Sequence, residues 1–201
     1  MNTRTILSLF DYTGNWSRPY KEAGFNVIQV DKKFGQDILT FEYRKHLQVF
    51  GVLAAIPCTD YALSGARWFA EKDADGRTEE SNKLVRKTLE IIKHFNLVFW
   101  VIENPMSRIH ICNPELGKPV FKFNPYEFAG YDPIPINSQY NKRTWLWGKF
   151  NNPEYKCLSP LLDYNPGWKK YGGKSERTKE LRSITPLGFA YAFFEANRFS
   201  I

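Results

Sequence analysis

Two uninterrupted apolar runs, joined by an amphipathic helical pattern, constrain the fold of this chain more than any other feature of its sequence. GVLAAIP at residues 51–57 and LVFWVIEN at residues 97–104 are apolar at successive positions, which is typical of strands buried on both faces of a parallel sheet. Between them, residues 78–95 place apolar side chains on one face of a helix, with Thr78 and Ser81 as candidate caps. The order predicts two parallel strands joined by a crossover helix.

A second unit of the same kind precedes the first. Residues 5–10 and 27–31 predict short strands, and SRPYKEAG between them predicts a helix closed by Gly24. This alternation predicts an α/β domain with a Rossmann-like fold, in which a mainly parallel sheet carries helices on both faces.

Chemically useful side chains stand at the predicted carboxyl ends of four strands, where ligands bind in folds of this class. They are Gly14, Asp31, Cys58 after Pro57, and Glu103 before Asn104. Asp31 is placed to accept both hydroxyls of a ribose, or else to cap a turn. Cys58 is placed to act as a nucleophile while Glu103 exchanges protons with the substrate, or else to be an inert buried thiol. Because Glu103 ends an apolar strand, its charge is costly without a partner or a task.

The formal net charge is +7, and the excess of positive charge is concentrated late in the chain. Ten lysines and arginines stand against four acids between residues 140 and 182, interleaved with tryptophans and tyrosines. Such a segment predicts contacts to the phosphates and bases of a nucleic acid, and a solvated basic surface over core aromatics is the alternative. Nine prolines break residues 105–182 into short pieces. In this part residues 139–150 predict one strand, and residues 185–197 predict a helix with Pro186 in its first turn.

We expect a single domain over residues 1–201, since this length suits one substantial core. No apolar run is long enough to cross a bilayer and the first residues lack a cleavage-like site, so we expect a cytoplasmic protein with no membrane partner. Three widely spaced cysteines without a CxxC pair fit neither a disulfide framework nor a zinc ribbon. His110 and Cys112 have no identifiable partners, so no metal site is predicted.

Several segments in order resemble the motifs of the cytosine-C5 DNA methyltransferases. PCTDYALSG at residues 57–65 resembles their Pro-Cys catalytic motif, and IENPMSRIH at residues 102–110 resembles their Glu-Asn motif. LSLFDYTGNW and GFNVIQVD are similar to their first two S-adenosylmethionine-binding motifs, and Asp37–Ile38 in GQDILT resembles the third. The order and approximate spacing hold over residues 5–148, which is nearly three quarters of the chain.

The Gln-x-Arg-x-Arg motif of that family is matched in part by QYNKRTWLWG. Gln139 and Arg143 keep the pattern, and Asn141 stands where the first arginine would be. Compact chains of this pattern resemble methyltransferases of phages, mobile elements and restriction-modification systems, which implies a bacterial cell or a phage-infected host.

The resemblance implies a covalent mechanism. The thiolate of Cys58, after Pro57, would add to C6 of cytosine, and the activated C5 would then take a methyl group from S-adenosylmethionine. Glu103 would hold the base at N3 and the exocyclic amine, Arg143 would reach the O2 side, and Asn104 would brace the catalytic loop. A duplex substrate would have to flip its cytosine into the cleft.

The resemblance also implies a set of cofactor-binding residues. Phe10 and Gly14 would line the methionine end of S-adenosylmethionine, with Asp31 at the ribose and Asp37 at the adenine amine. The full set that it implies is Phe10, Asp11, Tyr12, Thr13, Gly14, Asn15, Trp16, Asp31, Asp37, Ile38 and Pro57.

Three departures from the family pattern leave alternatives open. The residues after Pro-Cys differ, and the glycine-bearing, charged loop at residues 61–82 fits either a closing lid or a disordered surface loop. The large target-recognition domain is also missing, since residues 149–182 are too few to form one. Either that basic segment contacts DNA with little sequence specificity, or a separate recognition subunit acts, or the substrate is a free pyrimidine nucleotide. A nucleic-acid-binding protein that has lost turnover is a further alternative.

Overall fold

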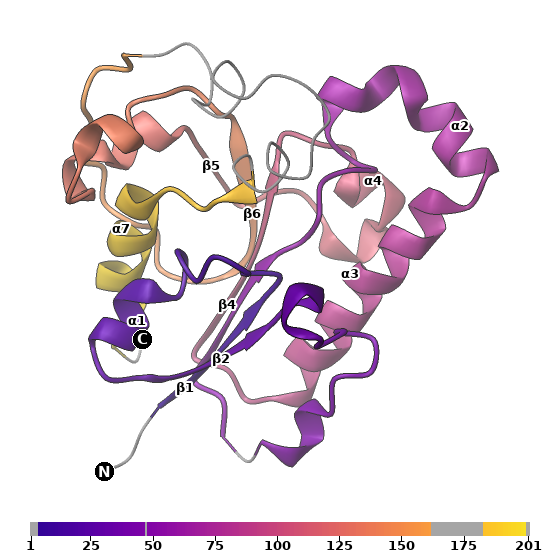
Figure 1. Cartoon of the computed structure of the whole chain (residues 1–201), viewed down its shortest axis with the longest axis horizontal. Helices are drawn as coiled ribbons and strands as arrows, with labels where there is room; N and C mark the ends of the chain where they lie inside the picture. Colours follow the sequence, from indigo (N-terminus) through magenta and orange to yellow (C-terminus); the bar gives the residue numbers. More distant parts are fainter. Residues whose placement is uncertain (1–3, 47, 162–182, 200–201) are drawn as a thin grey trace.

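A computed structural model of the chain describes residues 4–46, 48–161 and 183–199. Its centre is a six-stranded sheet in the order β2-β1-β3-β4-β6-β5 (Figure 1). The strands are β1 (Thr5–Leu9), β2 (Asn26–Val30), β3 (Gly51–Ala55), β4 (Phe99–Pro105), β5 (Phe121–Phe123) and β6 (Thr144–Lys149). The predicted α/β architecture is therefore confirmed, and the four strands predicted before residue 105 all form.

The sheet is parallel except at β6. Neighbours among β1 to β4 pair in parallel, whereas β6 pairs antiparallel with both β4 and β5. The carboxyl ends of β1 to β4 consequently meet at one edge of the sheet, at the top of Figure 1. Glu103 and Asn104 lie at the carboxyl end of β4, as predicted, and pairing with β6 extends the strand to Pro105.

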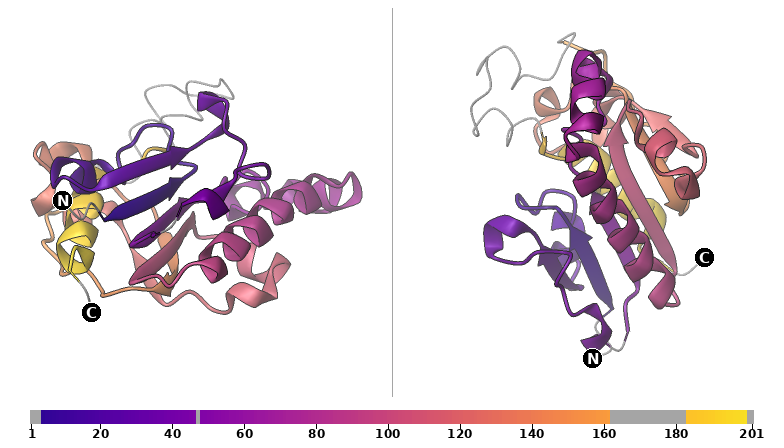
Figure 2. Two further views of the ribbon diagram at one scale, coloured as in Figure 1. Left: turned by 90° about the horizontal axis from the view of Figure 1, so that it is seen from below. Right: turned by 90° about the vertical axis from the view of Figure 1, so that its right-hand side faces the viewer.

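Helices cover both faces of the sheet, as the right-hand view of Figure 2 shows. One face packs under α3 (Arg77–His94), and the other packs under α1 (Arg18–Glu22) and α7 (Leu187–Asn197). Successive residues of β1 serve the two layers, since Leu7 belongs to the first core cluster and Ile6 to the second. Full burial of one such side chain contributes about 1.5–3 kcal/mol. This explains why the central runs are apolar at every position rather than at alternate ones.

Aromatic rings fill the second layer. Trp16 and Tyr20 come from the α1 side, and Phe189 and Phe193 come from α7, with Trp16 contacting both of these phenylalanine rings. The predicted carboxyl-terminal helix is thus confirmed, although Pro186 is its N-cap rather than a member of its first turn.

The predicted caps of the helix before β4 were wrong. Helix α3 begins after Gly76, whose φ of 84° suits glycine, so neither Thr78 nor Ser81 is its cap. The predicted lid or disordered loop at residues 61–82 is instead mostly helical. It contains the 3₁₀ helix η3 (Leu63–Trp68), then α2 (Phe69–Ala74), and then the start of α3.

The 3₁₀ helices η1 (Lys32–Phe34) and η2 (Tyr43–Lys45) follow β2, and α4 (Ile109–Cys112) and η4 (Pro114–Leu116) follow β4. The 3₁₀ helices η5 (Pro125–Tyr131) and η6 (Pro135–Asn137) lie between β5 and β6. Within the ranges that the structure describes, no helix has the length and apolarity required to span a membrane.

Candidate functional site

The turn after β1 has an unusual backbone. Phe10 has a φ of 61°, a left-handed conformation that costs a bulky residue of the order of 1–3 kcal/mol and that clusters at functional sites. Its N–H donates to the Val30 carbonyl at 2.8 Å, which keeps the turn beside the end of β2. Gly14 also has a positive φ, 68°, and a Cβ there would stand 3.1 Å from Nε2 of Gln29. The chain therefore passes close to β2 at this point.

Two of the predicted cofactor-binding side chains in this turn have structural partners. Asp11 is buried, and its Oδ2 accepts hydrogen bonds from the hydroxyls of Ser8 and Ser17, both at 2.9 Å, and from the Ser17 N–H. Trp16 is fully buried among the rings of α7. Neither side chain is exposed at the carboxyl edge of the sheet, so they shape the turn.

The other predicted residues of the turn lie nearer the surface. Tyr12 is 43% exposed and its ring centroid is 5.3 Å from that of Phe34, which is itself exposed. Thr13 is exposed, and Nδ2 of Asn15 donates to the Thr185 carbonyl at 3.3 Å. Tyr12 and Phe34 therefore offer aromatic surface at the ends of β1 and β2.

The carboxylates after β2 already cap local backbone. Oδ1 of Asp31 accepts from the Lys33 N–H at 2.9 Å, the turn-capping alternative that the sequence left open. Oδ1 of Asp37 accepts from the Leu39 N–H at 3.0 Å, and Oδ2 lies 3.1 Å from Nζ of Lys32. These contacts, the backbone hydrogen bond first, hold the pKa of Asp37 below its ordinary value despite some desolvation. Ile38, by contrast, is a core residue.

An open hollow of about 370 Å³ lies beside this segment. Lys32 and Leu39 line it from the β2 side, Asp60 from the turn after Cys58, and Ser81 and Leu84 from α3. Small-molecule sites of this kind have volumes of roughly 300–1,000 Å³. The hollow therefore lies between the segment after β2 and the chain after Cys58, but none of the predicted cofactor-binding or catalytic side chains lines it.

Cys58 lies in a tight turn after β3. Its carbonyl accepts from the N–H groups of Tyr61 at 3.0 Å and Ala62 at 2.9 Å, while its side chain is half-buried. From the next strand, Nδ2 of the buried Asn104 donates to the Ile56 carbonyl at 2.8 Å. The Pro-Cys turn and the Glu-Asn strand are therefore joined directly.

Glu103 lies on β4 between Ala55 of β3 and Leu146 of β6. Burial raises the pKa of its carboxyl group, an effect that the nearby cation of Lys142 opposes. The buried Tyr140 lies close enough to Glu103 to be affected by its charge. Desolvation raises the pKa of the Tyr140 hydroxyl most, and the Glu103 carboxylate raises it further. A carboxyl group in this environment retains its proton to a higher pH than an exposed glutamate does.

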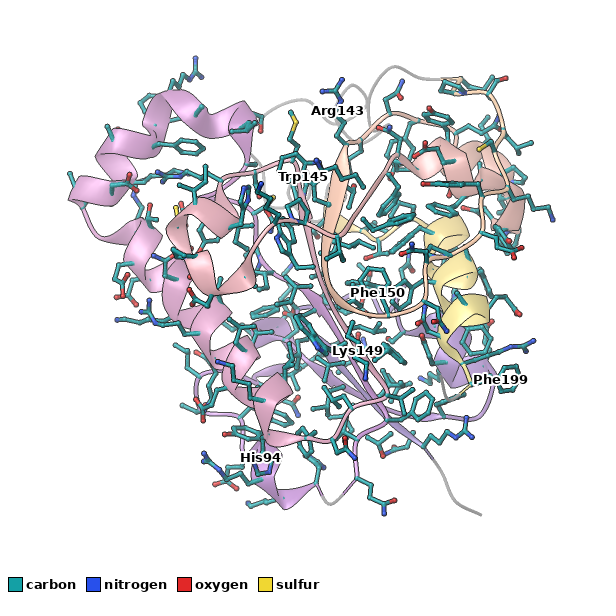
Figure 3. The ribbon with its side chains drawn as sticks, turned by 180° about the vertical axis from the view of Figure 1, so that it is seen from behind. His94, Arg143, Trp145, Lys149, Phe150 and Phe199 are labelled. Carbon is teal, nitrogen blue, oxygen red and sulfur yellow. The ribbon has the colours of Figure 1, made fainter. Side chains whose placement is uncertain are left out.

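Arg143 is exposed at the start of β6, and its carbonyl accepts from the Met106 N–H at 2.8 Å. Figure 3 shows Arg143 at the carboxyl edge of the sheet, at the opposite end of the molecule from His94. The structure therefore places Pro57, Cys58, Glu103 and Arg143 along one edge. The parts of the predicted basic segment at residues 162–182 lie outside the described residues.

Charged residues that the sequence analysis did not select fix the chain after Cys58. Nζ of the buried Lys72 lies 3.0 Å from Oδ1 of Asp60 and also donates to the Thr59 carbonyl. Oδ2 of Asp60 accepts from the Ser81 hydroxyl at 2.6 Å. This buried network connects the turn that follows Cys58 to both α2 and α3.

A second ion pair holds α2 from the other side. The guanidinium of Arg108 contacts both carboxylate oxygens of Asp73, at 2.8 and 2.7 Å, and donates to the Thr78 hydroxyl at 3.0 Å. It also lies 3.7 Å from the Phe69 ring centroid. Arg108, followed by Thr78, lowers the pKa of Asp73 to about 2, so the contribution of this pair to stability is present above about pH 4 and is lost as the pH falls toward 2.

Replacing Lys72 by methionine is expected to lower the free energy of unfolding by about 3–5 kcal/mol, since it leaves the Asp60 carboxylate buried without its cation. Urea unfolding followed by circular dichroism measures this loss. Lys83→Met is the matched control, because its ion pair with Glu80 is exposed and is worth about 0–1 kcal/mol. A Lys72→Met protein as stable as the control would contradict the expectation.

Nothing in the described residues supports a metal site. No three His, Cys, Asp or Glu side chains in the described ranges come together in a way that could hold an ion. His110 instead packs near the rings of Trp145 and Trp147, at centroid distances of 5.8 and 5.9 Å.

No family model matches the chain, and no curated protein matches it either. Among solved structures, a methyltransferase from Entamoeba histolytica is similar to it, at 11% sequence identity and a TM-score of 0.44. The similarity covers 88% of this chain and 62% of that methyltransferase. At this level of similarity, a functional conclusion depends on the residues of the site.

Proposed function

We propose that the protein is an S-adenosylmethionine-dependent methyltransferase that methylates C5 of cytosine in DNA. The observation that best supports this is the hydrogen bond from Asn104 to the Ile56 carbonyl. It joins the turn that carries Cys58 to the strand that carries Glu103, so a thiol and a desolvated carboxyl group stand on adjacent strand ends. A covalent mechanism on a cytosine ring needs those two groups at one site.

In this mechanism Cys58 and Glu103 have different roles. The Cys58 sulfur adds to C6 of the ring, and electron density moves toward N3 and C5. A protonated Glu103 donates to N3 and limits the charge that develops there, a role that its raised pKa favours. After C5 has gained the methyl group, a base removes the C5 proton and the bond between Cys58 and C6 breaks, which restores the thiolate and the aromatic ring.

S-adenosylmethionine would supply the methyl group, and we assign its adenosine half to the hollow beside Asp60. Leu39 and Leu84 provide apolar surface on which a purine ring can pack, and Lys32 and Ser81 provide polar groups at its rim. The exposed Tyr12 lies next to this segment of the chain, at the end of β1.

Two assays on the wild-type protein test the proposal. Methyl transfer from labelled S-adenosylmethionine to a cytosine oligonucleotide measures turnover, and an oligonucleotide with 5-fluorocytosine traps the covalent adduct because its C5 fluorine cannot leave as a proton does. We expect both signals. Salt-dependent DNA binding without either signal would instead favour the non-catalytic alternative, and methylation of free cytosine nucleotides alone would favour the small-substrate alternative.

Filling the hollow is expected to weaken cofactor binding. Leu39 is 39% exposed on its rim, so Leu39→Trp adds bulk there without disturbing the core. A ligand of this size gains about 0.3 kcal/mol per atom, and displacing about five atoms lowers affinity by about tenfold. Titration calorimetry with S-adenosylmethionine measures the change, and Ile111→Trp, at an exposed position of α4, is the control. Equal affinities in the two variants would place the cofactor elsewhere.

A further inference from the structure

The segment after the nucleophile forms a wall along the carboxyl edge of the sheet. Ala62 forms an antiparallel bridge with Ser107, and the Leu63 N–H donates to the Met106 carbonyl at 3.3 Å. The Met106 N–H in turn donates a hydrogen bond to the Arg143 carbonyl. We call residues 63–76, which comprise η3 and α2, the arm; Figure 1 shows α2 reaching beyond the end of the sheet above α3.

The arm is held at three places. The buried Lys72–Asp60 pair ties it to the Cys58 turn, the Arg108–Asp73 pair ties it to the end of β4, and Arg77 lies 2.5 Å from Glu71 of α2. Swinging the arm away from the site would break the Lys72–Asp60 pair and the bidentate Arg108–Asp73 pair together. The arm is therefore a preassembled wall rather than a lid that opens and closes.

The arm presents an aromatic ring and a cation to solvent. Trp68 is 45% exposed, and the guanidinium of the exposed Arg67 lies 5.1 Å from the centroid of its ring. Leu63, which is 43% exposed, follows Cys58 by five residues and adds apolar surface on the side nearer the nucleophile. Arg67 lies over one face of the ring, so a nucleobase would stack on the opposite face while the guanidinium meets the phosphate joined to it.

We propose that Trp68 and Arg67 form a stacking platform for an unpaired base next to the target cytosine, and that the substrate is single-stranded DNA. The position of the target cytosine at Cys58 rests on the proposed function. A fixed arm offers no movement with which to extract a base from a duplex, whereas the bases of a single strand are already free to stack. The positive net charge of +7 favours a polyanionic strand.

Fluorescence anisotropy with a labelled DNA strand of about 16 nucleotides containing one cytosine, and with its duplex, tests this inference. We expect the wild-type protein to bind the single strand about tenfold or more tightly than the duplex. Trp68→Ala is expected to lose about tenfold in affinity for the single strand, which corresponds to the stacking of one base, and Trp68→Phe is expected to keep most of the affinity. Duplex binding is expected to change little in either variant.

Phe199→Ala is the matched control. Phe199 is also exposed and also lies under an arginine, with Arg198 4.7 Å from its ring centroid, but it lies well away from Arg143 (Figure 3). Tighter duplex binding, or unchanged single-strand binding by Trp68→Ala, would overturn the inference. Because binding needs no methyl transfer, a protein that binds the single strand through Trp68 but never methylates would overturn the proposed function alone.

Discussion

Replacement of Cys58 by alanine is expected to abolish methyl transfer and the covalent adduct with 5-fluorocytosine. Cytosine C5 is a poor nucleophile until sulfur adds to C6, so removing the sulfur removes the step that activates the ring. Loss of a nucleophile on which the whole mechanism depends costs about 10⁴-fold or more in rate. Single-turnover assays with labelled S-adenosylmethionine measure the rate, and denaturing gel electrophoresis detects the adduct.

Cys157→Ala is the control for this experiment, since Cys157 is an exposed cysteine in the chain. It is expected to keep both the wild-type rate and the adduct. The half-buried Cys58 side chain is small, so the alanine variant is also expected to fold and to bind S-adenosylmethionine as before. An adduct that persists in Cys58→Ala but disappears in Cys157→Ala would show that Cys157 is the nucleophile and would contradict the assignment to Cys58.

The sequence predicts the layered fold well because local pattern and tertiary burial agree in β1 to β4. Strands that are covered on both faces must be apolar throughout, and that requirement is visible in GVLAAIP and LVFWVIEN. The strand β5 was missed because its three residues, FKF, form a strand only through pairing with β6. A segment this short carries no periodicity of its own.

The candidate site could be predicted only in part, for a related reason. Cys58, Glu103 and Asn104 follow from their positions on apolar strands, which fix where the chain emerges at the sheet edge. The sequence predicts Thr78 and Ser81 as helix caps, but their hydroxyls donate to the carboxylates of Asp73 and Asp60 instead. Side-chain partners across α2 and α3 depend on tertiary geometry that residue spacing does not encode.

The same limit applies to the charged residues of the arm. In the sequence, Lys72 is one charge among many in EKDADGR, and nothing there distinguishes it from an exposed lysine. In the fold, burial beside Asp60 distinguishes Lys72 from the other charged residues of that run, and the two-point contact with Arg108 distinguishes Asp73. The sequence left both a closing lid and a disordered loop open for this segment, and two ion pairs rather than backbone propensity favour a fixed wall.

Replacing Glu103 by glutamine is expected to separate activity from stability. The amide cannot donate a proton to N3 of the cytosine, so methyl transfer is expected to fall by about 10²–10⁴-fold, the range of general acid catalysis. The free energy of unfolding, by contrast, is expected to rise at high pH. Because the pKa of Glu103 is raised from its ordinary value of 4.5, the folded protein keeps a proton that the unfolded chain releases, and stability of the wild type falls as the pH rises above that value.

Glu103→Gln lacks that pH-dependent loss, since its side chain carries no charge to desolvate. Its free energy of unfolding is therefore expected to match the wild type near about pH 4 and to exceed it at about pH 8. Urea unfolding at several pH values measures the difference, and Glu154→Gln, at an exposed position, is expected to follow the wild type throughout. A glutamine variant that is less stable at high pH and still active would mean that Glu103 is a structural ion-pair partner of Lys142. A variant that is more stable and inactive would show that the buried Glu103 carboxyl group lowers the stability of the fold and is required for methyl transfer.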